Sequence, residues 1–354
     1  MDFFNELGKM CELTVLFERK NASDRESTWL SNAGIYFKTE YLEGQKVGAD
    51  SALCLGVTKW LKKGRFDFFI VGGYSSPTAM LAIETLRLRK IPFILSADGG
   101  FIKDEGKLKF LVKTHFIKEA KYYLSSGKTT SNYLQYYGAS SNEIYEYPFS
   151  SLHQSDILDK ILSYTEKSNY KKELNINEDK MILTIGQFIF RKGFDVLLEA
   201  CSKLPEGYGL YIVGGEPTQE YIDLKEEYEL ENVHFVGFKN KEELEKYYMA
   251  SDVFVLPTRE DVWGLVINEA MAYGLPVITT DKCIAGLELI NDYENGFIVP
   301  VARPDILAER IQEVLSNEQL ANKMAKVSLG KIRPYTIENM ASQHFEILRK
   351  IMAI

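Results

Sequence analysis

The sequence predicts an α/β protein made of two halves, each a parallel sheet covered by helices. At 354 residues the chain is too long for one ordinary hydrophobic core, so two domains are expected. Short apolar runs alternate with longer segments of helical spacing, which is typical of parallel sheets. The alternation breaks at residues 150–177, which are polar and charged, and we interpret this segment as the connection between the halves.

Nine apolar runs have the length of buried strands. They lie at residues 12–17, 68–71, 92–96, 122–126, 181–185, 210–213, 233–236, 253–256 and 276–279. Helical spacing is clearest where Phe194, Leu197, Leu198 and Cys201 fall on one face. Three predicted helices close the chain at residues 305–315, 318–329 and 337–351.

The N-terminus departs from this order. A helix stripe of Phe3, Phe4, Leu7 and Met10 precedes the first predicted strand at residues 12–17. In sheets of this type the first strand is central, and a gap there would leave backbone groups unpaired. We therefore expect the chain as given to begin one strand late, with a rearranged sheet as the alternative.

Composition and charge exclude several classes of protein. The chain is 45% hydrophobic and 26% charged, and its net charge of -8 argues against non-specific nucleic-acid binding. The four cysteines and four histidines are scattered, so neither a disulfide framework nor a metal site is expected. The sequence has neither an apolar run of about 20 residues nor a secretion signal at its start, which favours a cytoplasmic protein.

The most informative segment runs from Pro257 to Ile278, directly after the apolar run 253–256. It leads into a predicted helix that begins near residues 263–265, with Asp261 just outside the first turn. Free amide groups and the helix dipole make such a start a natural site for a phosphate. Glu269 follows within the helix, where its carboxylate could accept hydrogen bonds from a ribose diol. Taken alone, Asp261 could equally be an N-cap and Glu269 a solvated helix residue.

This segment resembles the E-x7-E region of retaining GT-B glycosyltransferases, particularly glycosyltransferase family four, the group 1 enzymes. Asp261 stands at the first acidic position and Glu269, followed by Ala-Met-Ala, at the second. The resemblance implies that Asp261 faces the hydroxyls of the donor sugar and Glu269 the ribose. It also implies that main-chain groups of Trp263, Gly264, Leu265 and Val266 approach the sugar and the pyrophosphate.

A second match lies at residues 186–193, between a predicted strand and a predicted helix. Arg191 and Lys192 are adjacent cations beside a glycine turn, and such a pair suits a pyrophosphate leaving group. A solvated basic helix start is the alternative. The resemblance assigns Lys192 to a donor-phosphate contact, while Gln187 stands where the family usually has an arginine. Arg191 is the candidate to replace that arginine.

Two strand ends complete the predicted donor site. Gly215 lies in a glycine turn after residues 210–213, where it either lets a ligand approach or makes a tight turn. The family has a similar turn near the donor. Val236 ends the run 233–236, which matches the family's strand beside the nucleotide base.

In the first half, Asp98 follows the run 92–96 and precedes Gly99 and Gly100. Ligands of α/β proteins bind at such strand ends, so Asp98 is a candidate contact to donor or acceptor, with a turn-forming role as the alternative. The family often has His-Asp here, and Ala97 takes the place of that histidine. Between residues 103 and 121, six lysines are interleaved with apolar residues. This pattern suits an acidic membrane surface, with a solvated helix face as the slightly favoured alternative.

The resemblance implies a GT-B fold in which two Rossmann-like domains face each other across a cleft. We expect domains at residues 1–150 and 151–334, with a helix at about 335–354 packing back on the first. The implied reaction is metal-independent and needs no cofactor: a sugar passes from a nucleotide diphosphate sugar to a glycan or lipid-linked acceptor with retention, in bacterial surface polysaccharide biosynthesis. The alternatives are a sugar-nucleotide epimerase of the same architecture and a catalytically silent binding protein. Cytoplasm is the expected location, with peripheral contact to the inner membrane through residues 103–121.

Overall fold

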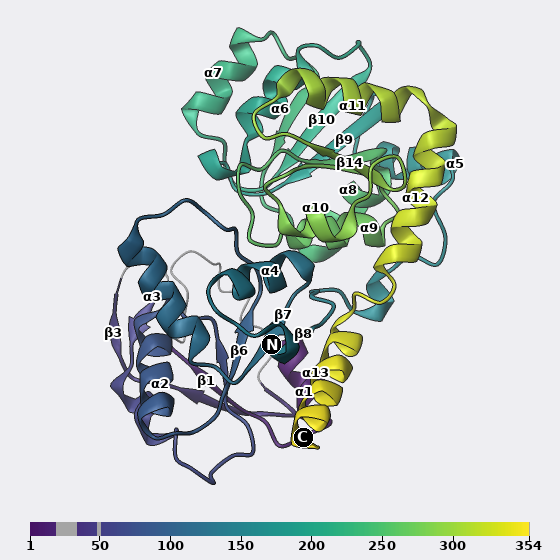
Figure 1. The fold of residues 1–354 in the computed structure, drawn as a ribbon. Helices are drawn as coiled ribbons and strands as arrows, with labels where there is room; N and C mark the ends of the chain where they lie inside the picture. The colour runs from purple at the N-terminus through teal and green to yellow at the C-terminus, as the bar shows by residue number, and fades with distance from the viewer. Residues whose placement is uncertain (19–33, 48–50, 354) are drawn as a thin grey trace. The chain divides into compact units, whose positions relative to one another are not determined.

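The computed structural model describes residues 1–18, 34–47 and 51–353 and divides into two compact units (Figure 1). Unit 1 consists of Met1–Ser151 together with Thr336–Ile354, and unit 2 is Leu152–Tyr335. Each unit contains a parallel sheet with helices packed on it, which confirms the predicted fold class.

Unit 2 is built on a six-stranded parallel sheet in the order β11-β10-β9-β12-β13-β14. The strands are β9 (Lys180–Ile185), β10 (Tyr208–Val213), β11 (Val233–Val236), β12 (Val253–Leu256), β13 (Val277–Thr280) and β14 (Gly296–Val299). The chain runs outward from β9 to β11 and then returns to place β12 on the other side of β9. The order of the strands therefore reverses between β9 and β12, the point at which sheets of this kind bind ligands.

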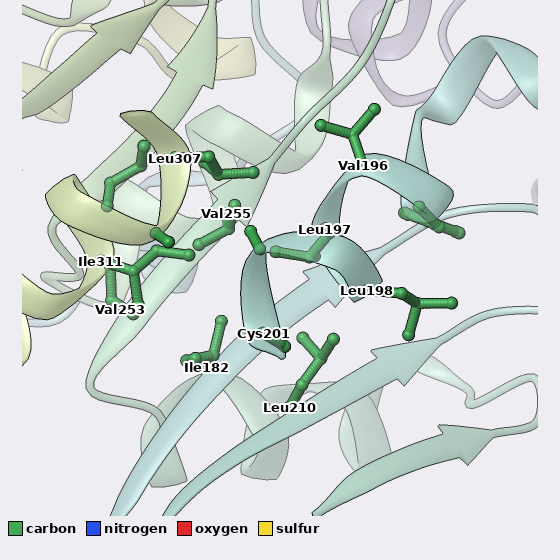
Figure 2. Close-up of a cluster of buried hydrophobic side chains, with 14 of the residues drawn as sticks. Ile182, Val196, Leu197, Leu198, Cys201, Leu210, Val253, Val255, Leu307 and Ile311 are labelled. Atoms are coloured by element: carbon green, nitrogen blue, oxygen red, sulfur yellow. The ribbon is translucent and has the colours of Figure 1, made fainter. Parts of the chain in front are cut away.

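One face of this sheet carries the main hydrophobic core of unit 2 (Figure 2). Helices α6 (Phe194–Cys201) and α11 (Pro304–Ser316) cover it. Leu197 and Ile311 are fully buried there, and so is Ile182 of β9. Burying a side chain of this size contributes roughly 1.5–3 kcal/mol, so the cluster fixes α6, and with it the loop that enters α6, on the central strands.

The other helices of unit 2 are α5 (Tyr164–Glu173), α7 (Gln219–Glu227), α8 (Lys241–Ala250), α9 (Leu265–Ala272), α10 (Ile284–Leu289) and α12 (Glu318–Ile332). Helix α8 contacts β9, and α9 contacts β12 and β13. The ring of Tyr248 in α8 lies 6.1 Å from that of Phe254 in β12. Phe254 points to the face opposite Val253 and Val255, so helices cover both faces of the sheet.

Unit 1 contains a four-stranded parallel sheet in the order β5-β6-β7-β8. The strands are β5 (Ile70–Gly72), β6 (Ile94–Ala97), β7 (Tyr122–Ser125) and β8 (Ile144–Glu146). Helices α2 (Pro77–Leu88), α3 (Lys107–Lys118) and α4 (Lys128–Tyr136) contribute Ile83, Ile117 and Leu134 to one hydrophobic core of this unit. Helix α13 (Ile337–Met352) contributes to a second core with Ile94, Tyr122 and Leu124.

The first residues form helix α1 (Asp2–Gly8) and strand β1 (Thr14–Phe17). Strand β1 pairs in parallel with β2 (Lys38–Tyr41), and β3 (Gln45–Lys46) pairs antiparallel with β4 (Ala52–Leu53). Short 3-10 turns at Leu55–Lys59, Ser141–Glu143, Gln154–Asp156 and Phe190–Lys192 complete the elements described. The expectation that the chain begins one strand late stays a prediction.

His344 of α13 is buried in unit 1, with 4% of its surface exposed. Its ring centroid lies 4.3 Å from that of Tyr147 and 4.8 Å from that of Phe3 in α1. Its Nδ1 donates to the carbonyl oxygen of Met340 over 2.7 Å. Burial disfavours the charged imidazolium and lowers the pKa of His344 to about 4. Well above pH 6.5 the ring is thus neutral in both the folded and the unfolded chain.

We expect acidification to destabilise unit 1 through this side chain. As the pH falls from 6.5 towards 4, the unfolded chain binds a proton that the folded chain does not, so stability is lost by up to about 3 kcal/mol. His344→Phe keeps an aromatic ring against Phe3 and Tyr147 but removes the group that binds this proton in the unfolded chain. Urea unfolding at pH 7.5 and pH 5 measures the effect. The variant is expected to lose less stability than the wild type over this interval, and parallel losses would contradict the assignment.

Candidate functional site

The candidate site of unit 2 lies at the carboxyl ends of β9 and β12, on both sides of the strand-order reversal. The segment after β9 contains Arg191 and Lys192 in a 3-10 turn, and the segment after β12 contains Asp261. The backbone amide of Arg259 donates to the carbonyl of Arg191 over 2.8 Å, so the two segments are hydrogen-bonded to each other. Residues about 70 positions apart in the sequence are thereby brought together.

Gly193 explains how closely these segments approach. Its φ of +70° is in the left-handed region, which glycine adopts without strain. A Cβ atom at this position would lie 2.2 Å from the carbonyl oxygen of Pro257, too near for any side chain. Glycine here therefore permits both the turn into α6 and the contact between the two segments.

The carboxylate of Asp261 is the point on which the two cations converge. Lys192 Nζ lies 2.7 Å from Asp261 Oδ2, and both side chains are only 13% exposed. Arg191 Nη1 lies 3.3 Å from the same oxygen and donates to the carbonyl of Glu260 over 2.8 Å. The site thus places two cations around one small anionic group, an arrangement that also suits a phosphate oxygen.

Arg259 holds the 3-10 turn in place, a role that the sequence did not indicate. Its guanidinium binds both carboxylate oxygens of Asp195, at 2.7 and 2.5 Å, and also donates to the carbonyl of Phe190. The guanidinium lies over the ring of Phe190, 3.9 Å from its centroid. Because Phe190 and Asp195 flank Arg191 and Lys192, this bidentate contact fixes the backbone that carries the two cations.

Helix α9 begins at Leu265, as expected from the sequence. Gly264 precedes it with a φ of +99°, and a Cβ atom there would lie 2.8 Å from the sulfur of Cys283. The first amides of a helix, here those of Leu265 and Val266, have no partner within the helix. Trp263 is buried, and its indole N–H donates to Asn268 Oδ1 over 2.9 Å, so any ligand contact of Trp263 would come from its main chain.

Glu269 is half-buried in α9 and accepts a hydrogen bond of 2.7 Å from the hydroxyl of Tyr248. Tyr248 in turn stacks on Tyr273, with ring centroids 5.0 Å apart and planes 4° from parallel. Burial raises the pKa of Glu269 above its usual value. Tyr248 was not predicted: it occurs within a helix, and no motif marks it.

The remaining predicted donor residues lie at neighbouring strand ends. Gln187 follows β9 and is exposed. Gly215 follows β10, and a Cβ atom there would have no other atom within 4 Å, so the backbone is open to a ligand. Val236 ends β11, and its carbonyl accepts from the amide of Gly214 over 3.0 Å. The carboxyl ends of β9, β10 and β11 thus form one continuous edge beside Lys192.

Asp98 belongs to unit 1, where it directly follows β6. Its side chain accepts a hydrogen bond of 3.0 Å from the buried hydroxyl of Tyr147, and its carbonyl accepts from Ser126 Oγ over 2.9 Å. These bonds hold Asp98 at the carboxyl edge of the sheet of unit 1. All the other predicted site residues belong to unit 2.

Within residues 1–18, 34–47 and 51–353, no three His, Cys, Asp or Glu side chains are grouped as a metal ion would require. In the same part of the chain, no helix combines the length and the apolarity that a membrane crossing needs.

Comparison with known proteins gives the class of this fold. Residues 166–328 match the family model of the glycosyl transferases group 1. The chain superposes on the crystal structure of HepE from Anabaena in complex with UDP with a TM-score of 0.79, covering 98% of this chain and 95% of that one at 16% identity. The protein therefore has the GT-B fold of glycosyltransferases. The match of residues 166–328 to the group 1 model confirms the resemblance found in the sequence.

Curated relatives share part of the sequence. An uncharacterized glycosyltransferase of Methanocaldococcus jannaschii is 33% identical over 203 residues, which are 54% of this chain and 50% of the relative. N,N'-diacetylbacillosaminyl-diphospho-undecaprenol alpha-1,3-N-acetylgalactosaminyltransferase of Campylobacter jejuni is 22% identical over 299 residues, 82% of this chain and 78% of the relative. The chain spans about half the length of the first curated relatives that it matches.

Proposed function

We propose that the protein is a glycosyltransferase that moves a sugar from a nucleotide diphosphate sugar to a glycan or lipid-linked acceptor. The observation that carries this proposal is the convergence of Lys192 and Arg191 at the strand-order reversal, beside the first amides of α9, which have no partner within the helix. A diphosphate leaving group needs such a set of cations and amide dipoles. The relative from Campylobacter, whose name describes sugar transfer to a diphospho-undecaprenol carrier, supports this class of acceptor.

In the proposed reaction the bond between the sugar C1 and the phosphate oxygen breaks, and its electron pair leaves with the nucleotide diphosphate. The charge that develops on that leaving group is stabilised by the cations Lys192 and Arg191 and by the amides of Leu265 and Val266. The acceptor hydroxyl attacks C1 from the face that the diphosphate leaves, so configuration is retained, and its proton passes to the departing phosphate. Because side chains neutralise the charge, the proposal needs neither a metal nor a cofactor.

Glu269 and Asp261 hold the two ends of the donor in this proposal. Glu269 has one carboxylate oxygen on Tyr248 and can offer the other to the ribose hydroxyls. Asp261 faces the sugar hydroxyls once the diphosphate has taken over its contacts with Lys192 and Arg191. Gln187, Gly215 and Val236 line the strand ends on the nucleotide side. Asp98 of unit 1 is the candidate polar contact to the acceptor. Surface polysaccharide biosynthesis is the proposed setting.

A nucleotide panel tests the proposal. We expect at least one of UDP, GDP and dTDP to raise the melting temperature of the full chain, and the matching nucleotide sugar to lose its sugar to an added acceptor. A nucleotide sugar that is hydrolysed or isomerised equally well without any acceptor would instead favour an epimerase. The absence of any shift with all three nucleotides would favour the silent binding protein, which the departures at Gln187 and Ala97 also suit.

Asp261→Asn is expected to strengthen nucleotide binding while it weakens transfer. The Asp261 carboxylate pairs with the two cations that a diphosphate would bind, so its replacement frees Lys192 and Arg191. The affinity for the nucleoside diphosphate should rise several-fold, measured by calorimetry, because two cations lose a competing charge. The transfer rate should fall at the same time, because an amide is a weaker acceptor for sugar hydroxyls. Weaker binding of the diphosphate by this variant would refute competition at this carboxylate.

A further inference from the structure

Helix α3 of unit 1 presents an apolar stripe to solvent. Leu108, Leu111 and Val112 fall at positions i, i+3 and i+4, so they share one face. Their exposed fractions are 76%, 61% and 40%, and Ile102 in the preceding loop is 50% exposed. Single exposed apolar residues are ordinary on protein surfaces, whereas a contiguous group marks an interaction site.

The opposite face of α3 is firmly packed, so the stripe is a fixed part of the surface. Ile117 is fully buried in the core of unit 1, and Phe110 packs against that core. Lys113 points inward as well: its Nζ lies 2.9 Å from Glu105 Oε2 and 3.4 Å from the hydroxyl of Tyr137. The inner face of α3 is therefore the one that packs against unit 1, and it includes one of the lysines, Lys113. The stripe of Leu108, Leu111 and Val112 is the outer face of the helix.

Cations surround the stripe. Lys107 and Lys109 are exposed beside Leu108, and Lys118 is exposed in the last turn. Residues 101–121 contain six lysines and three acidic residues, within a chain whose overall net charge is -8. A positive segment on an otherwise acidic protein is complementary to an anionic surface, and leucines between lysines are the pattern of helices that lie in a lipid interface.

We infer that α3 with its preceding loop, residues 102–118, docks the protein on an anionic membrane surface. Leu108, Leu111 and Val112 enter the boundary of the acyl chains, while Lys107 and Lys109 contact lipid phosphates. A nucleic acid would use the lysines but not the leucines. The inference deepens the proposed function, because only residues 99–106 separate Asp98 from α3, and docking there brings this candidate acceptor contact to the membrane that holds a lipid-linked acceptor.

Vesicle sedimentation of the full chain without nucleotide tests the inference. The protein is expected to bind vesicles of phosphatidylcholine with phosphatidylglycerol at least tenfold more tightly than pure phosphatidylcholine vesicles. Each lysine near an anionic surface strengthens binding about fivefold, so Lys107→Gln/Lys109→Gln should weaken it roughly 25-fold at low salt. Leu108→Ser/Leu111→Ser should weaken it at least tenfold at any salt concentration, because it removes buried apolar surface.

Leu88→Ser is the matched control, since Leu88 of α2 is 72% exposed and lies outside the stripe. Unchanged far-ultraviolet circular dichroism and unchanged nucleotide binding establish that each variant folds and that the site of unit 2 is intact. Vesicle binding that ignores phosphatidylglycerol, or that Leu88→Ser weakens as much as the stripe variants do, overturns the inference. The inference is also overturned if the protein does not bind vesicles but binds an acidic protein through α3. Loss of nucleotide binding with vesicle binding intact counts against the proposed function alone.

Discussion

Replacing Lys192 by alanine is expected to lower the rate of sugar transfer by about 10²–10³-fold. Lys192 is only 13% exposed and lies 2.7 Å from Asp261, where we place the diphosphate oxygen that leaves with the nucleotide. Removing one preorganised donor to a developing charge typically costs this much, about 3–4 kcal/mol of transition-state stabilisation. Because the charge grows as the bond breaks, the loss should fall more on kcat than on KM.

Steady-state kinetics on the nucleotide sugar that the panel identifies measure this effect. Lys246→Ala is a suitable control, because Lys246 is a half-exposed lysine of the same unit whose partner is Glu173. Arg191→Ala should give a smaller loss than Lys192→Ala, since the Arg191 side chain is 46% exposed and water partly replaces it. If the kinetics of Lys192→Ala are close to those of the wild type, Lys192 does not stabilise the leaving group.

Asp252→Ala is expected to destabilise unit 2 by about 3–5 kcal/mol. Its carboxylate lies 2.8 Å from Lys171 Nζ and 3.8 Å from Lys167 Nζ, and it accepts from the amide of Met181 at the start of β9. Burial alone would raise the pKa of Asp252, but the two lysines outweigh burial and hold it below its usual value. Removing a buried charge that two cations share leaves those cations uncompensated, which is why the expected cost is large.

Glu173→Ala provides the matched comparison. Glu173 belongs to α5, as Lys167 and Lys171 do, and it pairs with Lys246 over 3.1 Å. Both side chains of this pair are about half exposed. An exposed pair of this kind is worth about 0–1 kcal/mol. Urea unfolding, fitted with one transition for each unit, should therefore separate the two variants by several kcal/mol. Equal stabilities would show that the contacts of Asp252 with Lys167, Lys171 and Met181 do not hold α5 on β9.

The sequence predicted the central strands of unit 2 well, because their surroundings leave little choice. Strand β12 is covered on both faces and reads as an unbroken apolar run, and its predicted bounds, 253–256, are those observed. The edge strands β8 and β14 were missed. Strand β8 has only three residues, Ile-Tyr-Glu, and pairs with β7 alone, so neither length nor alternation distinguishes it from a loop. Strand β14 starts at a glycine, which favours a turn.

The sequence predicted which residues belong to the candidate site, but not which of them contact each other. Lys192 and Asp261 stand out because each follows a strand end, and ligands of such folds bind there. That these two residues share one ion pair follows from the strand order, which places β12 next to β9. Tyr248 lies on the buried face of α8, and from the sequence alone it resembles any core tyrosine. Its hydrogen bond to Glu269 is seen only in the folded chain. Arg259 is in the motif, but only the folded chain brings Asp195 to it.

The central claim is that a nucleotide diphosphate binds at the carboxyl edge of the unit 2 sheet, between Lys192 and the start of α9. A crystal structure with the nucleoside diphosphate that gives the largest thermal shift tests it most directly. We predict phosphate density within hydrogen-bonding distance of Lys192 Nζ and of the amides of Leu265 and Val266, with the ribose on Glu269. Well-defined nucleotide density at any other place on the protein would contradict it.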